Sequence, residues 1–203
     1  MPAWPAAVAA VGAVAAGLAV TLLLFVRGER RRDRARVAGD ELLRAAGDML
    51  GAQFRPAAPR SWTGYRAAFG SLHGSASELT YGITINDRRS EDVGHAACIS
   101  AQAPTGASFT VEVAAARLAA ARPGVTMAEL FGRRRAQRIP PSAGDPLLGI
   151  VAMSSDFSVT ARSLTAHSRP SVWQLSDQAE PAPLANFATA VLAAALLLLR
   201  HSD

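Results

Sequence analysis

The chain opens with an unbroken apolar stretch. Residues 6–26 are 21 residues without a charged side chain, and arginine follows directly at Arg27. As a helix this stretch is about 32 Å long, enough to cross the hydrocarbon core of a bilayer. Its start lacks the positive charge of a signal peptide, and no small-residue cleavage site separates it from Arg27. We therefore expect an uncleaved transmembrane helix at residues 6–26.

A basic juxtamembrane segment, a short helix and a linker are expected at residues 27–60. The segment begins with six arginines against Glu29 and Asp33, which gives it +4 of the total charge of +5. The positive-inside rule places residues 1–5 outside and the following domain in the cytoplasm. Anionic lipids attract such side chains, so six candidates for membrane-surface contact are Arg27, Arg30, Arg31, Arg32, Arg34 and Arg36.

The helical period appears first at residues 40–50. Their apolar positions form one stripe, and Gly51 is placed to end the helix. The stretch 51–60 is rich in proline and turn residues and is expected to connect this helix to a domain at residues 61–203.

Strict alternation marks the strands. Leu79, Tyr81, Ile83 and Ile85 alternate with polar or small residues, which predicts a strand with one buried face. Further strands are expected at residues 108–114, 95–103 and 66–74. The connections between them are polar and turn-rich, so neighbouring strands are expected to run antiparallel. Since one face of such a sheet is apolar, helices should cover it.

The remaining segments provide that cover. Helices are expected over residues 113–124 and 156–169, and strands over 147–155 and 171–177. The spacing of Thr126 and Glu129 fits a capping box that opens a short helix through Phe131. Together the patterns predict an α+β fold: an N-terminal transmembrane helix followed by a small domain whose antiparallel sheet is covered by helices.

The segment 184–199 is apolar on all sides and leaves three alternatives. Its 16 residues reach about 24 Å as a helix, which is short for a membrane span and typical of a buried helix. A covering helix would nevertheless show a polar face. We therefore keep open a core helix, a second span and a helix whose outer face meets a partner.

Composition narrows the possible partners. Outside the juxtamembrane segment the charges nearly cancel, whereas a nucleic-acid-binding domain carries a basic face, so we expect no nucleic-acid partner. Every basic residue is arginine and alanine is abundant, which we interpret as the bias of a GC-rich bacterial genome. The single cysteine, Cys98, excludes an intrachain disulfide.

Candidate chemistry is sparse. His95 and Cys98 form an H-x-x-C pair, but zinc needs four ligands, so we expect no metal or other cofactor. No nucleophile-elbow or nucleotide-binding glycine motif occurs. A basic stretch that could contact an anion or a partner contains Arg133, Arg134, Arg135 and Arg138.

These observations favour a non-catalytic protein over an enzyme. We expect a membrane-anchored interaction or accessory module at the bacterial inner membrane, in contact with the lipid bilayer and with a protein partner, within a larger complex. Two alternatives are a small-ligand sensor domain and an enzyme with a cryptic site around His95, Cys98 and Glu91.

Overall fold

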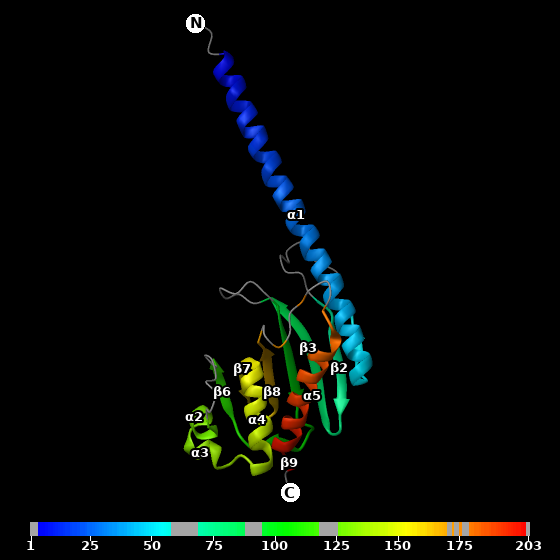
Figure 1. Ribbon diagram of the computed structural model, residues 1–203, viewed down its shortest axis with the longest axis vertical. Helices are drawn as coiled ribbons and strands as arrows, with labels where there is room; N and C mark the ends of the chain where they lie inside the picture. The colour runs from blue at the N-terminus through cyan, green and yellow to red at the C-terminus, as the bar shows by residue number, and fades with distance from the viewer. Residues whose placement is uncertain are drawn as a thin grey trace.

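An antiparallel sheet forms the centre of the fold, and helices lie over one of its faces (Figure 1). The computed structural model describes residues 4–57, 69–87, 95–117, 126–169, 172, 175 and 179–201, with the backbone alone at 4–15, 87, 113–117, 130, 131, 135 and 201. Within these residues the main sheet has seven strands in the order β1-β2-β3-β4-β8-β7-β6. The expected α+β class with an antiparallel sheet is therefore found.

Strands β1 to β4 form a meander, with each strand paired to the next. Their bounds are Gln53–Arg55, Ser71–Ala76, Leu79–Asp87 and His95–Gln102. The alternation predicted for β3 is confirmed, because Leu79, Tyr81, Ile83 and Ile85 are all buried. The segment 51–60 was expected to be a linker, but it contains β1, which is the edge strand of the sheet.

The strand predicted at 108–114 is confirmed only at its two ends, and the helix predicted at 113–124 is wrong at residues 113–117, which are a strand. Instead, β5 (Ala107–Phe109) pairs with β9 (Leu199–His201), and β6 (Val113–Arg117) pairs with β7 (Ser154–Val159). The Thr110 amide donates to the Leu198 carbonyl at 2.9 Å, which extends the contact between these two chain segments by one residue beyond the Phe109–Leu199 pair. Pairing with β7 overrides the helix propensity of the alanines in β6.

The helix expected at residues 156–169 is replaced by a hairpin. Its strands are β7 and β8 (Ser163–Ser168), and β8 pairs with β4. Phe157 and Val159 in β7, like Leu164 and Ala166 in β8, alternate with period two and are buried. The Thr160 hydroxyl accepts a hydrogen bond from the Ser163 amide at 2.9 Å and closes the turn. The strand predicted at 171–177 lies largely outside the described residues.

The strand expected at residues 147–155 is also wrong, because most of it belongs to helix α4 (Pro141–Met153). Proline at the first helical position suits a helix start, since it lacks the amide that would be unpaired there. The buried residues Ala143, Leu147, Ile150 and Val151 are spaced by four, three and one. That spacing is helical and places them on one face.

The short helix expected at 40–50 is the last part of a much longer one, α1 (Trp4–Leu50). This helix of 47 residues is about 70 Å long, and its N-terminal half projects away from the sheet (Figure 1). The predicted end is confirmed: Gly51 has a positive φ of 64°, and the Ala52 amide donates to the Gly47 carbonyl at 2.9 Å. This is the Schellman arrangement, in which glycine takes the left-handed position.

Helix α5 (Pro181–Leu198) lies between α1 and α4 and also contacts β3, β4 and β8. Neighbours on three sides explain why its sequence is apolar nearly all round, and nine of its residues are buried. The exposed positions are Asn186, Thr189, Ala193 and Leu197, which share one narrow face. Among the residues whose side chains the structure describes, which in α1 begin at residue 16, α5 is the one helix long and apolar enough to cross a membrane, and half of it is buried in the domain.

The capping box expected at Thr126 is present. The Thr126 hydroxyl accepts from the Glu129 amide, and the Glu129 carboxylate accepts from the Thr126 amide at 2.8 Å. Helix α2 (Met127–Phe131) follows, and then α3 (Arg133–Ala136). These hydrogen bonds to Thr126 hold the pKa of the Glu129 carboxyl below its usual value.

Candidate functional site

Four of the six juxtamembrane arginines lie on one side of α1. We call Arg27, Arg30, Arg31 and Arg34 the arginine stripe; their spacing of three and four places them on one helix face. The same face continues toward the N-terminus as Leu22, Leu23 and Val26. Leu23 is 68 % exposed, so this part of α1 is not packed against the domain. Arg32 instead pairs with Glu29 at 3.0 Å, and Arg36 is half-buried.

The second basic group lies at the end of the domain far from the projecting part of α1 (Figure 1). Arg133 and Arg134 are in α3 and Arg138 follows it, and all three side chains are exposed. The side chain of Arg135 is outside the described part. Within this basic stretch, residues 133–136 form one short helical turn. Because of their position, these arginines cannot act with the arginine stripe on one surface.

The expected pair of His95 and Cys98 is not assembled. Both residues are in β4, where positions three apart point to opposite faces of the sheet. His95 lies on the helix-covered face, with its ring edge-on to Phe69 at 5.2 Å between centroids. Glu91, the third residue of that hypothesis, lies outside the described residues. Across the described chain, no three histidine, cysteine or acidic side chains are close enough to hold a metal.

Cys98 instead lies on the face opposite the described helices, together with residues that the sequence did not connect to it. His167 in β8 is its direct partner across the strands, and Asp156 in β7 lies beyond His167, with 3.9 Å between Oδ2 and Nδ1. Burial raises the pKa of the Cys98 thiol, a hydrogen bond with Thr84 lowers it, and the charge of Asp156 raises it. The net shift of the Cys98 pKa is upward, whereas an activated thiol nucleophile has a lowered pKa.

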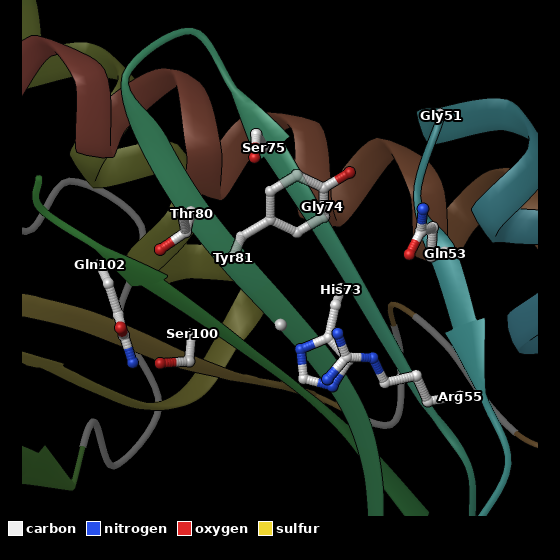
Figure 2. A pocket seen from close by; sticks show the side chains of 11 residues that line it. Gly51, Gln53, Arg55, His73, Gly74, Ser75, Thr80, Tyr81, Ser100 and Gln102 are labelled. Carbon is white, nitrogen blue, oxygen red and sulfur yellow. The ribbon is translucent and has the colours of Figure 1, made fainter.

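A hollow of about 690 Å³ lies on the same face, opposite the described helices and across β1 to β4. Figure 2 shows its side chains, with the Arg55 guanidinium and the His73 ring directed toward each other, and the β3 and β4 side chains across the hollow. The lining residues are Gly51, Gln53, Arg55, His73, Gly74, Ser75, Thr80, Tyr81, Gly82, Ser100 and Gln102. Apart from Tyr81, whose side chain points to the helices, their side chains are polar or absent.

The register of the strands explains why this hollow forms. Gly82 pairs with His73 on β2 and with Ser100 on β4, so all three positions face the same way. Side chains flank Gly82 on both sides while the glycine itself contributes none. The next rung, formed by Ser75, Thr80 and Gln102, continues the wall. The hollow is therefore the space above Gly82.

The charged end of the hollow is built from β1 and β2. Arg55 pairs with Ser71, and His73 is two positions further on the same face of β2. Such diagonal neighbours are within reach of long side chains. The His73 Nε2 atom and the Ser71 hydroxyl are 3.0 Å apart and share a hydrogen bond, which orients the ring. None of the described lining residues carries a carboxylate.

This site was missed at the sequence level because each of its polar residues occupies an ordinary solvent-side strand position. One signal was available: a glycine in the middle of the clearest strand pattern, between Thr80 and Thr84. An isolated glycine in a strand often marks a bulge or a place where something approaches closely. β3 has no register shift at Gly82, so a bulge does not account for this glycine.

Comparisons with protein-family models, curated proteins and solved structures each return no match. Function is therefore inferred from the geometry of the chain itself. Two features are the basis of that inference, the projecting α1 and the polar hollow.

Proposed function

We propose that this protein is a non-catalytic binding module anchored in the bacterial inner membrane, with its N-terminus outside and its domain in the cytoplasm. The single observation that carries the proposal is the continuity of α1. One helix contains the apolar segment, the arginine stripe and the buried residues Leu42, Leu43 and Ala46 of the domain core. A helix that is embedded at one end and packed at the other would hold the domain rigidly at the membrane.

Exposed apolar side chains support the anchor. Leu18, Val20, Leu22, Leu23, Leu24 and Phe25 are all exposed, and their neighbours at 16–27 are exposed as well. Water-soluble proteins rarely expose a continuous apolar surface of this extent, so lipid is the expected cover. The arginine stripe would then lie at the headgroups on the cytoplasmic side.

Topology can be tested on the full-length chain with a C-terminal epitope tag. The protein should stay in the membrane during alkaline carbonate washing. The tag should be resistant to protease in spheroplasts and digested in inverted vesicles. Extraction by carbonate, or digestion of the tag in intact spheroplasts, would refute the proposed anchor or its orientation.

A matched pair of variants tests the role of the stripe. Replacing Arg30, Arg31 and Arg34 together by glutamine should give a partly mixed orientation, because half of the six arginines that follow the span are lost. The same three-fold change at Arg133, Arg134 and Arg138 removes equal charge far from α1 and should leave orientation unchanged. Identical behaviour of the two variants would contradict the assignment.

The accessory role predicts a protein partner. Mild-detergent purification of the tagged protein from its native membrane should recover a partner at constant stoichiometry. The variant in which Arg133, Arg134 and Arg138 are replaced then tests the second basic group. If this variant keeps its membrane topology but no longer recovers the partner, the partner contacts the protein at α3. Full-length protein that is monodisperse and alone would argue against an accessory subunit.

A second candidate function is a small-ligand sensor domain, and the hollow above Gly82 favours it. Such a function requires no catalytic group and is compatible with a membrane anchor. A ligand that binds only the folded domain would raise its melting temperature.

A further inference from the structure

Gly82 is not explained by the packing of the fold. A Cβ atom built at this position would lie 3.7 Å from the Leu72 carbonyl oxygen and 3.9 Å from the His73 ring, which are ordinary contacts. The position would therefore accept a methyl group without any shift. Glycine in a strand interior weakens the strand, because it costs conformational entropy and packs nothing. What the glycine does provide is the open floor of the hollow.

The walls of the hollow specify a polar ligand. Hydroxyl and amide groups from Ser75, Thr80, Ser100 and Gln102 face one part of it. These groups can each donate or accept hydrogen bonds. Its volume of about 690 Å³ is within the range of small-molecule sites, although its lining is much more polar than is usual for them. An apolar ligand would leave these groups without partners.

The other end of the hollow specifies the charge. Arg55 presents a planar guanidinium that suits a carboxylate or a phosphate, which it can bind through two parallel hydrogen bonds. His73 lies beside it and is oriented by Ser71 through its Nε2 atom, so that Nδ1 is the ring nitrogen on the Gly82 side. With no carboxylate in the described lining, a bound anion meets attraction and no opposing charge.

We propose that the hollow above Gly82 binds a small organic anion, with its carboxylate or phosphate group held by Arg55 and His73 and its polar body held by the side chains of β3 and β4. This inference rests on the sensor function proposed as the second candidate and names its ligand class. It does not depend on the membrane anchor, because every lining residue except Gly51 is in a strand of the sheet.

Binding can be measured on the full-length protein in a neutral detergent. The probes are a panel of small carboxylates and phosphate esters, including citrate and glycerol 3-phosphate, together with neutral polyols of similar size. Thermal shift identifies binders and isothermal titration gives their affinities. We expect at least one anion to raise the melting temperature saturably, and the neutral polyols to have no such effect.

Three variants locate the site. Gly82→Val fills the hollow and should abolish binding while the melting temperature without ligand is kept or raised. Arg55→Gln should weaken binding by about tenfold or more, as expected for loss of a charged hydrogen-bonding partner. Arg162→Gln removes an exposed arginine from the turn between β7 and β8 and should bind as the wild type does. Gly82→Ala is the milder filling variant if valine impairs expression.

Each outcome decides something different. Binding of a neutral polyol that Gly82→Val abolishes would leave the sensor function standing and overturn the anionic class. Stabilisation by anions that persists in Gly82→Val would show a general ion effect and overturn the site. If no compound in the panel binds saturably, both the anionic ligand and the sensor function are overturned. The membrane-anchor proposal is tested separately, by the carbonate washing and protease experiments.

Discussion

Gly74 and Tyr81 are directly paired across β2 and β3, and the tyrosine side chain lies over the glycine. A Cβ atom at Gly74 would be 2.5 Å from Cζ and from the hydroxyl oxygen of Tyr81. The ring crosses this gap on the helix-covered face, and its hydroxyl donates to the Leu50 carbonyl at 3.2 Å. One cross-strand pair therefore joins the sheet to the end of α1, the helix that we propose as the membrane anchor.

Alanine at Gly74 should destabilise the domain. The added methyl group meets a buried ring that is fixed at its far end, and overpacking of this kind costs about 1–3 kcal/mol. Gly82→Ala is the matched control, because the same change on the opposite face of β3 meets no close atom. The free energy of unfolding, measured in urea, should fall for Gly74→Ala and be unchanged or slightly raised for Gly82→Ala. Equal losses in the two variants would contradict this account.

The Tyr81 hydroxyl should contribute measurably to the attachment of α1. Tyr81→Phe removes the hydrogen bond to the Leu50 carbonyl and keeps the ring over Gly74, so we expect a loss of about 1 kcal/mol. Hydrogen exchange should also become faster in the last turn of α1. Unchanged exchange in that turn would mean that the contact does not hold the helix end.

Asp40 holds α1 to the start of β2. Its carboxylate is buried and accepts a hydrogen bond from the Gly70 amide at 2.7 Å. Asp40→Ala leaves that amide without its partner and should cost about 1–3 kcal/mol. Asp40→Asn retains an oxygen acceptor and should cost less. Glu41→Gln, at the exposed neighbouring position, is the control and should be neutral in the same urea titration.

The thiol of Cys98 should lose its proton at a higher pH than an ordinary cysteine does. Burial raises its pKa, so the midpoint of alkylation by iodoacetamide in the folded protein should lie above about 8.5, the ordinary value, and return to that value in denaturant. Replacing Asp156 by asparagine removes a charge that also raises this pKa and should shift the midpoint down. A folded-state midpoint at or below the ordinary value would refute the raised pKa.

The same shift has a consequence for stability. A group whose pKa is raised by folding stabilises the folded state while it is protonated. The contribution of Cys98 is therefore complete below its ordinary pKa and is lost as the pH rises toward the folded-state value. Cys98→Ser should remove this part of the alkaline loss of stability. A pH profile above 8.5 that matches the wild type would show that the thiol does not contribute.

Several elements could be predicted because local chemistry alone determines them. The alternation in β3 and β4, the glycine that ends α1 and the capping box at Thr126 all appear in the structure as expected. Each of these features involves residues within one turn or one strand. The sequence pattern is therefore sufficient to predict the local structure. The predictions failed for β6, α4 and the β7–β8 hairpin. The apolar segments there are short and fit both the helical period of 3.6 residues and the strand period of two.

The candidate site could not be predicted in the same way. The hollow is assembled from β1 to β4, whose lining positions run from Gly51 to Gln102, and no short stretch of sequence contains it. His95 and Cys98, which are close in sequence, are on opposite faces, whereas Cys98 and His167 are distant in sequence and directly paired. The register of the strands determines which residues share a face and which residues are paired. Register in turn depends on hydrogen bonds between segments that are distant in sequence.

By itself, the sequence determined the apolar start, the arginines that follow it, the α+β class and the buried face of the central strands, because these depend on the order of neighbouring side chains. The tertiary structure decided that residues 27–50 continue the first helix, that α5 packs between α1 and α4, and that polar side chains of four strands surround Gly82. The reason is physical. Periodicity indicates which face of an element is buried, but only the packing of distant elements determines what covers that face and what the opposite face presents.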